Sequence, residues 1–295
     1  MRRQAFERPI ELVLPGMTCT CMSETLMAPS STLLTQLDDG VLTVSLNAPL
    51  RGNALSWEMV TALDELLQGI ALRDDVRVVM LQGSGTLFST GLDIEDFTRL
   101  VNDNLPRART ALECLHQWRS RLLTLLPQPV IGLVMGACHG AAVRLIEGCD
   151  IVLAADDAEF MLTAPDAALL ACHPACVPGP VWMDSSTLAR LQTPGHTLSG
   201  REAEQQGLVT LACARADLAQ EAQELARALV DKDRLALQFT KETVAHVDTM
   251  SWDAAVNFTA AKFAELKSRQ SSGSSARASG VQSFLAGKSK PGLGG

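Results

Sequence analysis

Tyrosine is absent from this chain of 295 residues, and aromatic side chains make up only 4% of it. Proteins that bind single-stranded nucleic acid stack the bases on aromatic side chains, so we expect no such surface here. Positive charge is also scarce, because 25 Lys and Arg stand against 33 Asp and Glu, a formal net charge of -8. This balance excludes a general attraction to nucleic acid, and an anionic ligand would need a local basic patch.

A long apolar run is missing as well. The best candidate lies in residues 129–160 and is broken by His139, Arg144, Glu147 and Asp150, whereas a membrane-spanning helix needs ~20 apolar residues. We therefore expect no membrane partner. The first 30 residues contain neither the apolar core of a signal peptide nor the acid-poor composition of a transit peptide. A cytoplasmic location is the expectation.

The cysteines give no sign of a disulfide framework or a metal site. There are eight of them, scattered along the chain, which favours reduced thiols in a reducing compartment. Cys172, His173 and Cys176 lie close together, but two further ligands at suitable spacing are missing, so no metal is expected.

The composition that is present fits a folded protein. Hydrophobic residues make up 47% of the chain and charged residues 20%, and the length is ample for a buried core. We expect residues 1–30 to be a disordered extension, residues 31–210 to form the core, and residues 211–295 to form a helical region and tail. Within the core, a hairpin is predicted to turn near residues 38–40, and Ser56 is predicted to cap a helix.

Two segments of the core share the order strand, small-residue turn, helix. The first covers residues 76–97 and the second residues 129–160, where an apolar strand leads through the turn 136–140 into a helix over 141–147. A turn of Gly and Ala lets the backbone approach a bound group closely, and it equally allows tight packing of helix on strand. Either turn alone leaves both interpretations open.

Together the two segments resemble the crotonase superfamily, the enoyl-CoA hydratase/isomerase-like proteins. The family motif G-x-G-x-x-F-[SC]-[AT]-G-x-D-[LI] is matched by Gly83, Gly85, Phe88, Ser89, Thr90, Gly91, Asp93 and Ile94. A second motif, P-V-I-x-x-V-x-G-x-A-x-G-[GA]-[GA] followed by C-D-I, is matched by Pro129 to Ile131, Val134, Gly136, Gly140 to Ala142 and Cys149 to Ile151. A third motif, L-N-R-P-x-x-x-N-A-[LM], is matched by Leu46, Asn47, Pro49, Asn53, Ala54 and Leu55.

The resemblance covers about residues 33–291 and implies the fold and the kind of substrate. The fold would be α/β, a crotonase-like spiral of repeated ββα units with a C-terminal helical trimerisation region, assembled as a homotrimer or hexamer. The substrate would be a thioester of coenzyme A or of an acyl carrier protein. Because coenzyme A or phosphopantetheine arrives with the substrate, no separate cofactor is expected.

The resemblance also assigns roles to individual residues. The amides of Leu92 and Ala141 would bind the thioester carbonyl oxygen and stabilise it as an enolate. Binding of the coenzyme would involve Arg51, Asn53, Ala54, Gly91, Asp93, Ile94, Gly140 and Lys288. Without the family context, Arg51 is equally interpretable as a solvated loop charge.

The acid/base residues depart from the family pattern. Arg144 stands where hydratases carry their first glutamate, and arginine cannot act as a base at neutral pH. Asp166, in a Pro-Asp pair, is the best candidate for proton transfer, although a helix-capping role is equally compatible with its position. His139 could also titrate near neutrality, and Glu147 lies almost one helical turn beyond Arg144.

These observations predict an acyl-thioester lyase or isomerase. Two alternatives remain open. The run H-P-A-C-V at residues 173–177 resembles a polyketide-biosynthesis branch that dehydrates 3-hydroxy-3-methylglutaryl groups on an acyl carrier protein. The missing glutamate also fits a catalytically silent homologue that only binds acyl-CoA.

Overall fold

The structure is a computed structural model in which we describe residues 32–120, 122, 126–161, 196–247 and 249–270. Its main sheet has six strands in the order β1-β2-β3-β4-β6-β9, and every neighbouring pair is parallel except β1 with β2. The strands are β1 (Leu33–Asp38), β2 (Val41–Leu46), β3 (Val78–Gly83), β4 (Val130–Val134), β6 (Ile151–Ala155) and β9 (Leu211–Cys213).

A tight hairpin begins the sheet. Asp39 and Gly40, between β1 and β2, have φ angles of 44° and 82°, the pair of positive values that a two-residue type I′ turn requires. The predicted hairpin near residues 38–40 is therefore confirmed. Glycine at the second position matches this geometry, because it adopts positive φ without steric cost.

A second, smaller sheet lies beside the first. It has the order β5-β7-β8, formed by β5 (Ala137–His139), β7 (Glu159–Met161) and β8 (Leu198–Ser199). The chain enters the main sheet as β4, moves to the small sheet as β5 and then forms helix α4 (Ala141–Ile146); it returns through β6 and β7 in the same order. This repetition confirms the predicted α/β spiral of ββα units.

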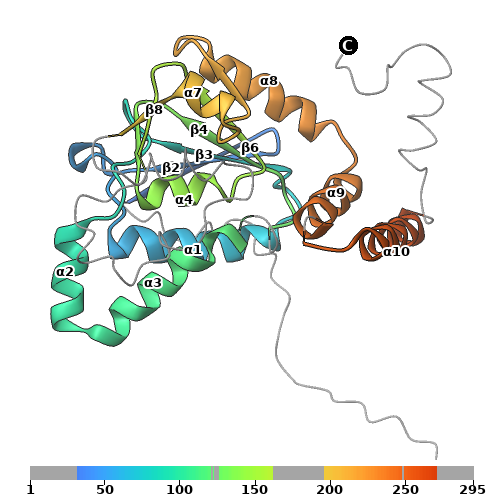
Figure 1. Ribbon diagram of the computed structural model, residues 1–295, viewed down its shortest axis with the longest axis horizontal. Helices are drawn as coiled ribbons and strands as arrows, with labels where there is room; N and C mark the ends of the chain where they lie inside the picture. The colour runs from blue at the N-terminus through green and yellow to red at the C-terminus, as the bar shows by residue number, and fades with distance from the viewer. Residues whose placement is uncertain (1–31, 121, 123–125, 162–195, 248, 271–295) are drawn as a thin grey trace, which may run out of the picture.

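Helices cover both faces of the main sheet (Figure 1). Helices α1 (Trp57–Ala71), α3 (Leu105–Ser120) and α4 lie on one side, with α2 (Ile94–Asp103) beyond them, and α7 (Gly200–Gln205) and α8 (Leu218–Val230) lie on the other. The hydroxyl of Ser56 accepts a hydrogen bond of 3.2 Å from the Met59 amide, which confirms the predicted cap of α1. Met59, Leu63 and Leu67 on one face of α1 are buried in the core.

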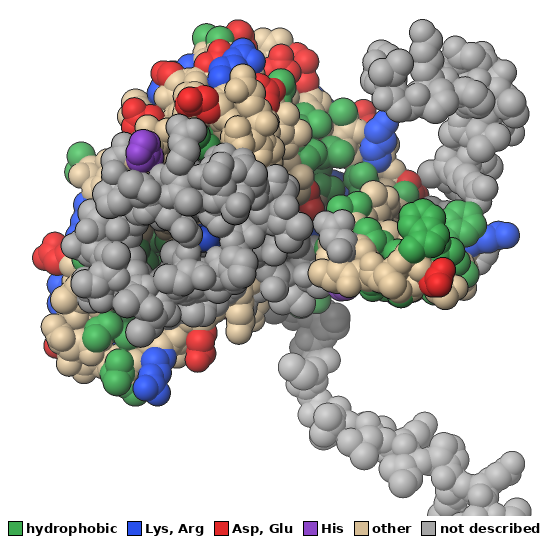
Figure 2. All heavy atoms as spheres, in the orientation of Figure 1, with side chains coloured by type: hydrophobic (Ala, Val, Ile, Leu, Met, Phe, Trp, Pro, Cys, Tyr) green, Lys and Arg blue, Asp and Glu red, His purple; other side chains and the backbone are tan. Residues whose placement is uncertain are grey.

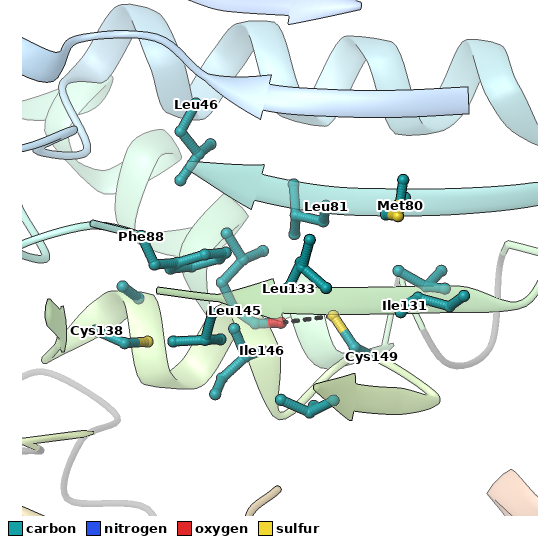
Figure 3. Close-up of a cluster of buried hydrophobic side chains, with 14 of the residues drawn as sticks. Leu46, Met80, Leu81, Phe88, Ile131, Leu133, Cys138, Leu145, Ile146 and Cys149 are labelled. Carbon is teal, nitrogen blue, oxygen red and sulfur yellow. Dashed lines mark hydrogen bonds between the residues drawn. The ribbon is translucent and has the colours of Figure 1, made fainter. Parts of the chain in front are cut away.

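The core fills the space between the main sheet and α4. Figure 3 shows Leu81 of β3 and Leu133 of β4 above Leu145 and Ile146 of α4, with the Phe88 ring beside them. Phe88 is completely buried, so the turn that follows β3 is anchored in the same core as α4.

The last two helices stand to the side of the sheet. Helix α9 (Arg234–Val247) packs against α10 (Trp252–Gln270), and Lys262 of α10 bonds Glu242 of α9 at 2.6 Å. Apolar side chains remain exposed on this pair: Val244, Trp252, Val256 and Phe263. Figure 2 shows hydrophobic side chains gathered on this part of the molecule.

Two predictions about organisation are not tested by this arrangement. The trimerisation role of the C-terminal helices stays a prediction, as does the division at residues 210 and 211, where β9 of the main sheet begins. Within the described part of the chain, none of the helices combines the length and the apolarity that crossing a bilayer requires.

Candidate active site

The buried side chain of Asn53 holds the turn after β3 in place. Asn53 has no exposed surface. Its amide group donates to the carbonyls of Ser84 and Leu87 at 2.8 and 3.1 Å, and its oxygen accepts from the Ala48 amide at 2.9 Å. Asn53, predicted as a coenzyme-binding residue, therefore uses its side chain to hold two loops together beneath the site.

The residues after this turn pair with the loop before α1. The amide of Leu55 donates to the Gly91 carbonyl at 2.8 Å, and the Asp93 amide donates to the Leu55 carbonyl at 3.1 Å. Along an extended chain successive amides point to opposite sides, so the amide of Leu92, between these two bonds, points away from Leu55. Ala54 precedes this pairing and is half-buried.

A parallel ladder joins the same segment to β5. The Ser89 amide donates to the Ala137 carbonyl, and the His139 amide donates to the Ser89 carbonyl, both at 3.0 Å. The hydroxyl of Ser89 accepts from the Gly91 amide at 3.1 Å. Backbone pairing thus holds the segment after β3, called here the first turn, directly against residues 137–140, called here the second turn.

The second turn ends in glycine and opens α4. The Gly140 amide donates to the Met161 carbonyl at 2.7 Å, and Gly140 has a φ of 54°. Ala141, 8% exposed, is the first residue of α4. The amides of the first helical turn have no partner within their own helix, so that of Ala141 is directed out of the helix end.

Gly91 brings the two turns within touching distance. It has a φ of 92°, and a β-carbon placed on it would lie 2.7 Å from the His139 carbonyl oxygen and 3.6 Å from the Ala141 nitrogen. No larger residue fits that space. Within the described ranges neither the Leu92 amide nor the Ala141 amide donates a hydrogen bond, so two adjacent turns each present an unused backbone donor.

An acidic and basic cluster borders the first turn. Asp93 is 4% exposed and caps α2 by accepting from the Asp96 amide at 3.1 Å. Its other oxygen lies 2.9 Å from the Arg51 guanidinium, which is 56% exposed and 3.6 Å from Glu95. Ile94 is the first residue of α2. Arg51 is therefore on the surface, oriented by a buried carboxylate.

An ion pair occupies the position of the expected glutamate. Nη1 of Arg144 lies 2.8 and 3.1 Å from the two carboxylate oxygens of Glu147, the residue that caps the C-terminus of α4. The Arg144 side chain is 18% exposed and that of Glu147 4%. Glu147 is thus engaged with the guanidinium.

His139 lies between the two turns and is half-buried. Burial lowers the pKa of its imidazole, and the nearby Glu159 opposes that shift. Nε2 is buried and has no hydrogen-bond partner in the described part of the chain. Because the lowered pKa favours the neutral ring at pH 7, His139 could accept a proton there.

The fold brings most of the predicted site residues together, and two of them lie outside the described residues. Backbone pairing joins the segment 51–55 to the segment 89–94, and this second segment to residues 137–141. Asp166 and Lys288 lie outside the described residues, as do Cys172, His173 and Cys176. Among the residues described, no group of His, Cys, Asp and Glu could hold a metal ion.

Comparisons with known proteins show what the chain as a whole is similar to. The family model described as enoyl-CoA hydratase/isomerase matches residues 36–291. The chain is 30% identical over 226 residues to a 1,2-epoxyphenylacetyl-CoA isomerase of Escherichia coli, covering 75% of this chain and 84% of the relative. It is 27% identical over 270 residues to a hydroxycinnamoyl-CoA hydratase-lyase of Pseudomonas fluorescens, covering 89% and 95%.

The fold is matched by solved structures. An enoyl-CoA hydratase from Bacillus anthracis superposes with a TM-score of 0.75 at 24% identity, covering 87% of this chain and 97% of the other. This match shows the fold, and the family model confirms the resemblance inferred from the sequence motifs. The polyketide branch remains a prediction, because the run at residues 173–177 lies outside the described residues.

Proposed function

Because the chain belongs to the enoyl-CoA hydratase/isomerase family, we propose that it binds an acyl-CoA thioester and acts on it as a lyase or isomerase. The carbonyl oxygen of the thioester would accept hydrogen bonds from the Leu92 and Ala141 amides. One observation carries the proposal: a β-carbon on Gly91, the residue before Leu92, would lie only 3.6 Å from the Ala141 nitrogen, so the two unused donors belong to backbone segments in close contact.

The chemistry follows from where charge develops. Removing a proton next to a thioester carbonyl, or adding a nucleophile to its conjugated double bond, puts negative charge on the carbonyl oxygen. Two fixed donors aimed at that oxygen stabilise the enolate by about 3–4 kcal/mol per donor, judged from the loss of one such donor elsewhere. Hydration, dehydration and a double-bond shift all pass through this charge.

Proton transfer is assigned to Asp166, with His139 as the second candidate. Arg144 cannot accept a proton at neutral pH, and Glu147 is bonded to it. A mechanism with two carboxylates on one water is therefore not supported by α4. The Asp166→Asn variant should lose turnover while keeping thioester binding, and unchanged turnover would remove Asp166 from the mechanism.

Coenzyme binding is assigned to the surface beside the first turn. Arg51 would contact a phosphate of coenzyme A from its exposed position, and the backbone around Ala54, Asp93 and Ile94 would line the approach. Gly91 and Gly140 would give the thioester room to reach the amides. Lys288 is proposed to meet the nucleotide end, as the family resemblance implies.

Self-association is proposed for the C-terminal helices. Trp252 is 81% exposed and Phe263 51%, on a helix pair that stands to the side of the sheet (Figure 1). Large exposed apolar side chains of this kind mark interaction surfaces. Sedimentation of the wild type and of a Trp252→Glu variant would test a trimer or hexamer, and a wild-type monomer would contradict it.

The activity test is mass spectrometry after incubation with crotonyl-CoA and with 3-hydroxy-3-methylglutaryl groups on coenzyme A and on an acyl carrier protein. Gain or loss of one water on any of them supports the proposal. A change only on the carrier-bound group would favour the polyketide reaction, whereas conversion of crotonyl-CoA would favour a general hydratase.

The geometry is tested with a pair of glycine variants. Gly91→Ala forces a β-carbon to 2.7 Å from the His139 carbonyl and separates the turns. We expect kcat/KM to fall about 100-fold or more, as for other ~1 Å displacements. Gly85→Ala is the matched control, since Gly85 also has a positive φ, 80°, but its β-carbon would only meet Pro49 at 3.5 Å. Equal losses in both variants would contradict the paired-donor geometry.

A second function is favoured by the ion pair on α4. Because Arg144 and Glu147 neutralise each other where a catalytic carboxylate is expected, the chain could bind acyl-CoA without converting it. Calorimetric binding of crotonyl-CoA, with neither a mass change nor a double-bond shift detected by NMR for any thioester tested, would establish this alternative.

A further inference from the structure

The side chain of Asn53 uses all of its hydrogen-bonding capacity on the chain around the first turn. Its amide group donates to the Ser84 and Leu87 carbonyls at 2.8 and 3.1 Å. Its oxygen accepts from the Ala48 amide at 2.9 Å and from the Ser84 hydroxyl at 3.2 Å. An asparagine side chain offers two donors and two acceptor sites. Since this one also has no exposed surface, it keeps no donor or acceptor for a ligand.

The residues beside Asn53 continue the same contact toward the Leu92 amide. The Gly52 carbonyl accepts from the Thr90 amide at 2.9 Å, and Leu55 pairs with Leu92 in a parallel bridge. One loop therefore holds the first turn at its start by a buried side chain and at its end by the backbone. The Leu92 amide lies in the last of these contacts, so its direction depends on where this loop sits.

The Ala141 amide is held by other contacts. It follows Gly140, whose own amide donates to the Met161 carbonyl at 2.7 Å. A displacement of the loop around Asn53 would therefore move the Leu92 amide and leave the Ala141 amide in place. Fixed donors stabilise a developing charge only when both are aimed at it, and a misplacement of about 1 Å can cost about 100-fold in rate.

We propose that Asn53 is a positioning residue for the oxyanion: its side chain sets the Leu92 amide against the Ala141 amide, and it contacts neither the coenzyme nor the acyl group. This inference rests on the proposed function, because it needs the thioester carbonyl to lie at these two amides. It deepens that function by adding a residue that acts on the charged state of the ligand, where the motif alone implies coenzyme binding.

The test uses a ligand whose charge can be measured directly. Acetoacetyl-CoA loses a proton to water from the carbon between its two carbonyl groups, the electron pair spreads onto both oxygens, and the resulting enolate absorbs in the near ultraviolet. Donors aimed at the thioester oxygen favour this charged form, so they lower the pKa of the bound ligand. Because the readout is an equilibrium, it does not depend on which residue transfers the proton. Butyryl-CoA, which lacks the second carbonyl group, reports thioester binding alone.

Asn53→Gly removes the side chain and keeps the backbone, because glycine adopts the φ of 50° found here without steric cost. We expect the enolate of bound acetoacetyl-CoA to be about tenfold less favoured than in the wild type, a part of the about 100-fold or more lost with a whole donor. Calorimetric affinity for butyryl-CoA should stay near the wild-type value, since a neutral carbonyl gains little from the same donors.

A second variant guards against failure of the first to fold. Asn53→Asp keeps an oxygen for the Ala48 amide and loses the amide group that donates to Ser84 and Leu87. Circular dichroism checks the fold of both variants. Asn53→Asp should disfavour the bound enolate in the same direction as Asn53→Gly, and a folded Asn53→Asp with the wild-type enolate preference would overturn the inference.

Gln128→Ala is the matched control. Gln128 is also buried, and its amide group also donates to two carbonyls, those of Ile70 and Arg73 at 3.1 and 3.2 Å. It lies just before β4, at the opposite end of that strand from the second turn. The variant loses the same kind of bonds, so it should weaken the fold and keep the enolate preference of the wild type. Equal losses of that preference in both variants would mean general loosening and would overturn the positioning role.

The outcomes separate this inference from the function beneath it. If the wild type binds neither thioester, or if bound acetoacetyl-CoA ionises as it does in water, the proposed use of the two amides fails and the inference fails with it. If the wild type favours the enolate and Asn53→Gly favours it equally, the paired amides stand and the role of Asn53 is wrong. A folded Asn53→Gly that loses its affinity for butyryl-CoA would assign Asn53 to coenzyme binding instead.

Discussion

Two ion pairs in this protein are buried to similar degrees and differ in what they connect. Lys241 of α9 lies 2.7 Å from Asp150, with side chains 5% and 20% exposed. It also donates to the Gln128 carbonyl at 2.9 Å, across 113 residues of sequence. Arg144 and Glu147 are three residues apart in one helix.

The difference shows what each pair does. Lys241 and Asp150 hold a C-terminal helix to the start of β4, because Asp150 also accepts from the Val130 amide at 2.7 Å. Burial lowers the pKa of Lys241 while the attraction to Asp150 opposes that shift. Since α9 is fastened to the sheet here, this pair serves the fold. The Arg144–Glu147 pair joins two residues of a single helical turn, so breaking it should affect the fold less than breaking the Lys241–Asp150 pair.

The largest effect is expected from Lys241→Met. It leaves the Asp150 carboxylate buried without its cation, and breaking a buried pair in this way costs about 3–5 kcal/mol. Urea denaturation measures the change in the free energy of unfolding. We expect the lower end of that range, because the Asp150 side chain is 20% exposed.

Two further variants separate charge from packing. Adding Asp150→Asn to Lys241→Met removes the unpaired charge and keeps an oxygen for the Val130 amide, so much of the lost stability should return. Arg201→Met breaks the exposed pair with Asp156, whose side chains are 56% and 37% exposed, and should cost about 1 kcal/mol or less. A Lys241 variant as mild as the Arg201 variant would remove the contrast between the pairs.

A smaller loss of stability is expected from Glu147→Gln. The variant removes the negative charge opposite Arg144 but keeps one amide oxygen that the guanidinium can bond, so the cost should be about 1–2 kcal/mol in urea denaturation. A destabilisation as large as that of Lys241→Met would show that the local pair supports the fold after all.

The contrast between local and distant contacts also explains how far the sequence alone could predict the structure. The hairpin at Asp39 and Gly40 and the cap at Ser56 depend on neighbouring residues, and both were predictable. The family motifs predicted the spiral because they fix where strands give way to turns. The positions of the Leu92 and Ala141 amides were predictable for the same reason, since each follows a glycine of a motif, and their role at a thioester stays a prediction.

Side-chain partners across the fold were harder to predict. Asn53 was assigned to coenzyme binding, yet its side chain bonds the carbonyls of Ser84 and Leu87, more than 30 residues away. Nothing local to Asn53 indicates those partners. The pairing of Lys241 with Asp150 likewise depends on how α9 meets β4. By contrast, the three-residue spacing of Arg144 and Glu147 is a local signal from which their contact could have been predicted.

His139 extends the comparison to a buried ionisable group that forms no ion pair with another described residue. Burial lowers the pKa of its imidazole, so the unfolded chain takes up a proton that the folded state resists. Stability should therefore be unaffected above about pH 6.5, the ordinary histidine value, and should be lost as the pH falls below it.

Thermal melts between about pH 7 and pH 5 should show a shallower loss of stability for His139→Gln than for the wild type. His196→Gln is the matched control, because His196 is exposed and its replacement should leave the wild-type slope. An unchanged slope in His139→Gln would mean that the ring is solvated well enough to be protonated in the fold, and it would then be available as an acid rather than a base.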